Sequence, residues 1–206
     1  MPAEIKKKFD AILAREKQMA KSIALKAMPS KPLSVWEVLI PVVFILGYMR
    51  SKADRDIFSQ NMLFTKKMAL EAALDMLKTK KSKAAALMQI ELKTKELLCS
   101  LPDGIYSDDI RQEQLGEINL LIDHYALLLG AGGEDYASLV VSSYRTGKDY
   151  ALFNDMLASA EKKVTEAARQ TLGHQADNDM AAKIEKIIDD LRRKEVETIF
   201  GPHRRH

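Results

Sequence analysis

Residues 150–167 read YALFNDMLASAEKKVTEA, and this stretch carries the pattern that decides the fold. Its apolar residues recur at alternating spacings of three and four, at Tyr150, Phe153, Leu157, Ala160, Val164 and Ala167. Such spacings place side chains on one face of an α-helix, where they form a seam for a neighbouring helix. The sequence therefore predicts helix-seam contacts at Tyr150, Phe153, Leu157 and Val164.

The same periodicity recurs elsewhere in the chain, most clearly in residues 3–28, 115–129 and 180–191. Breaks rich in proline, glycine or turn residues separate the helical stretches, at residues 28–32, 101–104, 130–133 and 173–177. Residues 38–49 form the one apolar run that suits a buried strand, and no second candidate strand exists to pair with it. We predict an all-α protein, an elongated or irregular helical bundle of about six helices, with one strongly apolar helix in the N-terminal half.

The 206 residues are 47% hydrophobic and 30% charged, a composition typical of a globular protein rather than a disordered chain. The formal net charge of +3 conceals an uneven distribution, because residues 1–83 carry a net charge of +9 and the remainder −6. A basic half of this kind favours contact with lipid or nucleic acid. The alternative is that the basic and acidic halves pack against each other, or that both are solvated.

Residues 33–49 read LSVWEVLIPVVFILGYM, with Glu37 as the only charged residue. As a helix these residues would span about 26 Å, slightly less than the ~30 Å hydrocarbon core of a bilayer. Pro41 lies in the middle of the run, where it removes a hydrogen bond and kinks or breaks a helix. Three interpretations stay open: a short span, a kinked hairpin entering one leaflet, and a buried core helix of a soluble bundle.

The flanks of the apolar run favour contact with a membrane. Both flanks are basic, and aromatic residues stand near both ends, as is typical of the bilayer interface. The predicted membrane-contact residues are Trp36, Val38, Leu39, Ile40, Val42, Val43, Phe44, Ile45, Leu46 and Tyr48. The predicted lipid head-group ligands are Lys31, Arg50, Lys52 and Arg55.

Patterns that would indicate catalysis or metal binding are missing from the sequence. Glu117 and His124 share a similar helical face, but the chain contains no Glu-x-x-His or His-Glu-x-x-His motif. A single cysteine, Cys99, excludes an internal disulfide and a multi-cysteine metal site. The glycine-rich residues 130–133 precede Glu134 and Asp135, which would repel a phosphate group. We expect no catalytic residue, no metal, no cofactor and no small-molecule substrate.

These observations divide the chain into a basic amphipathic helix (1–32), an apolar membrane-contacting or core segment (33–49) and a helical bundle domain (50–206). We expect a non-enzymatic scaffold or adaptor on the cytoplasmic face of a membrane, anchored through residues 33–49 and the flanking basic residues. Its expected partners are anionic lipid and either another protein or a second copy of the chain.

The alternative is a soluble cytosolic interaction module, or a homodimer, with residues 33–49 as its core. Nucleic-acid binding is less favoured, because the sequence pI of about 8.8 is below the value above 9 that is usual for such domains. The sequence also contains no helix-turn-helix, zinc finger or aromatic stacking platform that would recognise a nucleic acid.

Overall fold

The computed structural model describes residues 3–27, 54–100, 106–172 and 178–201. These ranges contain helices and no strand, which confirms the predicted all-α bundle. The helices are α1 (Ala3–Ala27), α2 (Asp54–Thr79), α3 (Lys83–Ser100), α4 (Asp108–Gly130), α5 (Tyr136–Tyr144), α6 (Gly147–Leu172) and α7 (Asn178–Phe200).

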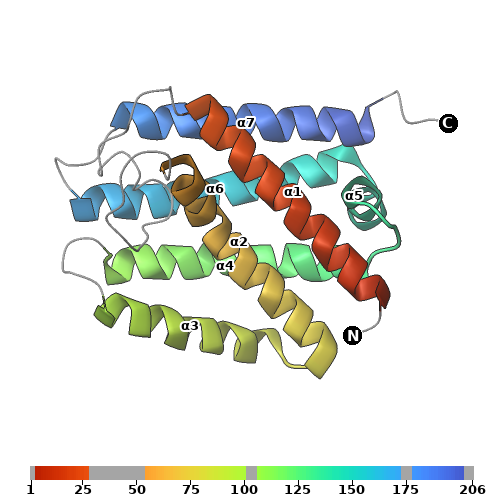
Figure 1. Ribbon diagram of the computed structural model, residues 1–206, viewed down its shortest axis with the longest axis horizontal. Helices are drawn as coiled ribbons and strands as arrows, with labels where there is room; N and C mark the ends of the chain where they lie inside the picture. The colour runs from red at the N-terminus through yellow and green to blue at the C-terminus, as the bar shows by residue number, and fades with distance from the viewer. Residues whose placement is uncertain (1–2, 28–53, 101–105, 173–177, 202–206) are drawn as a thin grey trace.

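The helices form two layers (Figure 1). In one layer α3, α4, α6 and α7 lie side by side, and each runs antiparallel to its neighbour. In the other layer α1 and α2 form an antiparallel pair that crosses the first layer diagonally, with α2 packed on α4 and α1 on α7. The short helix α5 lies at one end, where it contacts α1, α4, α6 and α7.

Two apolar clusters hold the layers together. The larger one includes residues from all seven described helices, among them Ile12, Leu70, Ile90, Ile122 and Tyr125. The smaller one joins α1, α2 and α7 near Ile23, Met62 and Ile184. The seam residues Tyr150, Phe153 and Leu157 lie in the larger cluster, and Val164 is fully buried.

Local chemistry explains where several helices begin and end. The Ser107 hydroxyl accepts a hydrogen bond from the backbone N–H of Ile110 at 3.3 Å, which caps the start of α4. Asp135 and Ser138 form a capping box at the start of α5. Gly133 adopts a φ of +142°, and a Cβ there would lie 2.5 Å from the Ser138 hydroxyl oxygen, so the turn between α4 and α5 requires glycine.

Most of the predicted lipid-contact residues lie outside the described residues. This applies to the whole of residues 33–49 and to Lys31, Arg50 and Lys52. Arg55 lies in the first turn of α2, and its side chain is outside the described part of the chain. Among the helices in the described ranges, none combines the length and the apolar composition needed to cross a bilayer.

Candidate functional site

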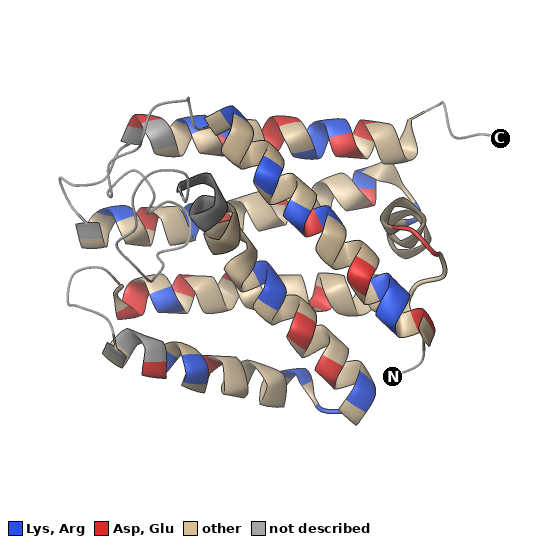
Figure 2. Ribbon diagram, in the orientation of Figure 1, with Lys and Arg blue, Asp and Glu red and all other residues tan. Residues whose placement is uncertain are grey.

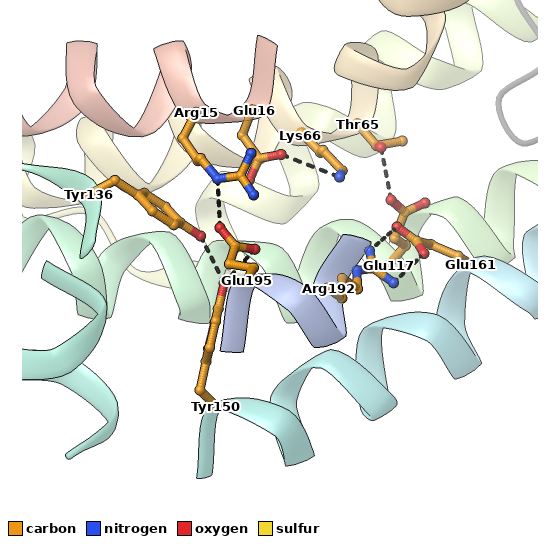
Figure 3. A network of polar contacts seen from close by, with 10 residues as sticks. All are labelled: Arg15, Glu16, Thr65, Lys66, Glu117, Tyr136, Tyr150, Glu161, Arg192 and Glu195. Carbon is orange, nitrogen blue, oxygen red and sulfur yellow. Dashed lines mark hydrogen bonds and ion pairs between the residues drawn. The ribbon is translucent and has the colours of Figure 1, made fainter. Parts of the chain in front are cut away.

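Charged side chains from five helices meet between the two layers (Figure 3). They are Arg15 and Glu16 from α1, Lys66 from α2, Glu117 from α4, Glu161 from α6, and Arg192 and Glu195 from α7. We refer to these seven residues as the buried charge network. Charged groups are costly to bury unless partners of opposite charge or hydrogen bonds compensate for lost hydration, so each contact constrains its helices.

One end of the network connects α1, α5, α6 and α7. The Arg15 Nε donates a hydrogen bond to the Glu195 carboxylate at 2.6 Å, and the Tyr150 hydroxyl donates to the same carboxylate at 3.3 Å. The Tyr136 hydroxyl lies 3.0 Å from the Tyr150 hydroxyl, and the Arg15 guanidinium lies 5.9 Å from the centre of the Tyr136 ring. Glu195 therefore accepts bonds from both layers at once.

A second contact connects α1 to α2. The Lys66 Nζ lies 3.3 Å from a carboxylate oxygen of Glu16, and both side chains are largely buried. Burial by itself would raise the pKa of Glu16, but the Lys66 charge opposes this and holds the pKa below its usual range. Glu16 is therefore an anion at neutral pH, and the pair stays charged inside the bundle.

At the other end, the Arg192 guanidinium donates two hydrogen bonds to the Glu161 carboxylate, at 2.8 and 2.7 Å. Because both partners are charged, these two parallel hydrogen bonds are stronger than bonds between neutral groups. Glu117 accepts a hydrogen bond from the Thr65 hydroxyl at 2.9 Å. Burial, followed by the nearby Glu161 charge, raises the pKa of Glu117 to about 7.

His124 lies beside the network and is buried in an aromatic environment. Its ring stacks on Phe153, with 4.1 Å between the ring centres, and its Nδ1 lies 2.6 Å from the Tyr144 hydroxyl. Burial lowers the pKa of His124 to about 3. The imidazole is therefore neutral at physiological pH and serves as a hydrogen-bonded core residue.

The network surrounds a cavity of about 30 Å³, lined by residues that include Arg15, Glu16, Lys66, His124 and Arg192. A cavity of this size holds about two water molecules, whereas organic ligands occupy roughly 300–1,000 Å³. The buried charges and this small volume suit a structural role, in which the network fixes how the two layers dock.

A metal centre has no support in the described parts of the chain, where no group of three or more His, Cys, Asp or Glu residues is placed to hold an ion. Glu117 and His124, the residues considered as ligands in the sequence, bond to Thr65 and Tyr144 respectively. The other acidic members of the network face arginine or lysine instead.

On the sequence alone, Glu117 and His124 stand out only because they share a helical face, and the predicted site residues include no member of the buried charge network. A usable signal was present in α1. Glu16 lies four residues after Ile12 and three before Met19, on the face whose other members are apolar. A charged residue at such a position predicts a buried ion pair, although its partner stays unknown until the helices are placed.

We expect the substitution Glu117→Gln to change how stability depends on pH. The pKa of Glu117 is about 7 in the folded state, against the usual 4.5, so the folded protein binds the proton more tightly than the unfolded chain does. The protonated carboxyl is therefore accommodated in the fold at full stability below pH 4.5. That contribution is lost as pH rises through 7, at a cost of about 3 kcal/mol. Between pH 4.5 and 8, the free energy of unfolding of the variant should therefore rise by about 3 kcal/mol relative to that of the wild type, as measured by urea unfolding. A constant difference across that range would contradict the raised pKa.

No protein-family model, curated protein or solved structure matches the chain.

Proposed function

We propose that the protein is a non-enzymatic scaffold on the cytoplasmic face of a membrane, whose helical bundle is anchored through residues 33–49. The observation that carries this proposal is the arrangement of α1 and α2. They form an antiparallel pair, so the C-terminal end of α1 and the N-terminal end of α2 lie at the same end of the bundle (Figure 1). Ala27 and Asp54, which flank residues 28–53, therefore lie on one side of the bundle, as a hairpin anchor entering one leaflet requires.

The surface of α1 supports an anionic lipid as the partner. Its exposed side chains include five lysines, Lys6, Lys7, Lys17, Lys21 and Lys26, against two acidic residues, Glu4 and Asp10. Figure 2 shows basic positions along α1 and at the turn between α2 and α3. Leu25 is 65% exposed in the last turn of α1, two residues before the end of that helix. Each lysine near an anionic surface contributes about 1 kcal/mol to binding.

The core of the bundle supports an anchor that is separate from the folded domain. The larger apolar cluster consists of side chains from the described helices, including Ile12, Leu70, Ile122 and Tyr150. The soluble alternative instead assigns residues 33–49 the role of the central core. We expect this cluster to keep the bundle folded when residues 33–49 are altered.

The double substitution Ile40→Asp/Phe44→Asp tests the proposal. Each aspartate near the centre of a membrane-embedded segment costs about 2.5–3.5 kcal/mol, so the variant should move from the membrane pellet to the soluble fraction. Circular dichroism of the released protein should show helix content and a melting temperature close to those of the wild type, because the bundle core is intact.

The matched control is Ile40→Leu/Phe44→Leu, which keeps the segment apolar and should stay in the pellet. If the aspartate variant loses its helical signal, residues 33–49 belong to the core. The protein is then the soluble interaction module described above as the alternative. If the aspartate variant is folded and still pelleted, the anchor lies elsewhere and the proposal is overturned.

A further inference from the structure

The surface of α4 and α6 on the side of the layer opposite α2 carries large apolar side chains exposed to solvent. Leu127 on α4 and Leu152 and Met156 on α6 are 47%, 61% and 52% exposed. Between the two helices runs a groove of about 370 Å³, to which α4 contributes Gly116 and Leu120. Apolar side chains gathered beside a groove are characteristic of a surface that another protein covers.

The charges along this groove differ between its two sides. Glu113 lies on the α4 side and Lys163 on the α6 side of the same groove. Because α4 and α6 are antiparallel, these two residues mark the same end of the groove, while Leu127 and Leu152 lie toward the other end. Neither Glu113 nor Lys163 takes part in an ion pair or hydrogen bond with another described residue. Within the described part of the chain, both charges therefore lack a partner of opposite sign.

Gly116 is the third feature of the groove. It lies inside α4, where glycine weakens a helix relative to alanine. A Cβ built at Gly116 meets nothing within 4 Å, so packing within this chain does not require a glycine. The residue across the groove is also small, Ser159 of α6. Glycine at such a position lets a second backbone approach closely.

We propose that two copies of the chain associate face to face along the α4/α6 groove, related by a two-fold axis parallel to the groove. This symmetry places α4 of one copy over α6 of the other, in antiparallel orientation. Glu113 of each copy then faces Lys163 of the other, Leu120 faces Met156, and Gly116 faces Ser159. The two sides of the groove are complementary to each other in charge, so the surface pairs with itself across a two-fold axis, which favours a second copy over an unrelated partner.

The size of the surface agrees with a dimer. The helices α4 and α6 contain 23 and 26 residues. Each helix is about 35 Å long and about 10 Å wide, so the two side by side present a face of roughly 700 Å². A standard stable interface buries about 800 Å² on each partner. The proposed dimer does not depend on the membrane anchor, because the surface lies on the side of the layer that α1 and α2 leave uncovered.

Sedimentation velocity of the purified full-length chain over a concentration series tests the proposal, with a density-matched detergent present. The wild type should sediment as a dimer, and Leu152→Asp/Met156→Asp should sediment as a monomer at the same concentrations. The matched control is Met88→Asp/Leu92→Asp on α3, which alters two residues of similar exposure outside the groove and should stay dimeric. Circular dichroism melting of each variant confirms that it is folded.

A charge-reversal series tests the two-fold arrangement itself. Glu113→Lys alone and Lys163→Glu alone should each raise the dimer dissociation constant at least tenfold, because each places like charges opposite one another. The double variant Glu113→Lys/Lys163→Glu again places opposite charges against each other. Its dimer dissociation constant should return to within about threefold of the wild-type value. Gly116→Ala should raise the melting temperature of the monomer and weaken the dimer.

Three results would overturn the proposal. The first is a wild-type chain that is monomeric at every concentration. The second is an α3 control that dissociates as readily as the groove variant. The third is a double charge reversal that weakens the dimer by the sum of the two single effects.

Discussion

Replacing Arg192 by leucine should lower the free energy of unfolding by about 3–5 kcal/mol. The Arg192 side chain is 7% exposed and holds the Glu161 carboxylate through two hydrogen bonds. Without it, Glu161 stays inside the bundle beside Glu117 with no cation to compensate for its lost hydration. Urea unfolding of the wild type and the variant at pH 7, followed by far-ultraviolet circular dichroism, measures the difference.

The chain supplies a matched control at the next position. Arg193 pairs with Asp190 at 2.6 Å, but its side chain is 70% exposed. Because solvent screens such a pair, Arg193→Leu should change stability by less than about 1 kcal/mol. Replacing both buried partners, in Arg192→Leu/Glu161→Leu, should recover most of the loss, since no uncompensated charge is left. Equal effects of Arg192→Leu and Arg193→Leu would contradict a buried charge network that fixes the helices.

The substitution His124→Phe should remove a large part of the stability that the fold loses as pH falls from 6.5 to 4.5. The pKa of His124 is about 3 in the folded state, against 6.5 as its usual value. Between pH 6.5 and 3, the unfolded chain therefore binds a proton at His124 that the folded protein does not bind. The stability that neutral His124 contributes above pH 6.5 is lost as the pH falls toward 3. The loss amounts to about 5 kcal/mol over that range. Phenylalanine has a similar shape and keeps the stacking on Phe153.

Urea unfolding of the wild type and His124→Phe between pH 3.5 and 8 gives this difference directly. The advantage of the variant should grow steadily below pH 6.5 and be small above it. His174, which the sequence places in the break before the last helix, provides a control: His174→Phe should leave the acid dependence unchanged. If His124→Phe loses stability in acid as steeply as the wild type, the histidine is protonated in the folded state and the burial argument fails.

The course of the helices could be predicted from the sequence because the signals that begin and end a helix are local. Ser107 and the acidic residues after it mark the start of α4, and glycine-rich residues 130–133 mark its end. Each of these features depends on a few neighbouring residues, so a single sequence contains enough information to place them.

The buried charge network could not be predicted in the same way because its partners are far apart in the chain. In α7 an apolar pattern alone selects Ile184, Ile187 and Leu191 as the inner face. In the structure Ile184 is buried as expected, but the next buried positions along α7 are Ile188 and Arg192. The inner face of α7 therefore includes a charged residue. Arg192 is stable there only because Glu161, on another helix, reaches it. The position of a charge within an apolar face is readable from sequence, but its partner is a property of the tertiary structure.

The two proposals place different partners on different sides of the molecule. The membrane anchor departs from the α1/α2 pair, which covers one side of the layer that contains α4 and α6. The dimer surface lies on the other side of that layer, at the exposed residues Leu127, Leu152 and Met156. A dimer of this kind would leave both anchors available, so self-association and membrane binding would add to each other.

Fractionation of the expressed wild-type protein tests the membrane anchor most directly. The membrane pellet is washed first with high salt, which screens contacts between lysines and lipid head groups, and then with alkaline carbonate, which strips proteins that are not embedded. The account predicts that the protein stays in the pellet through both washes, because residues 33–49 enter the hydrocarbon region. Recovery of the protein in the soluble fraction before any wash would contradict the account.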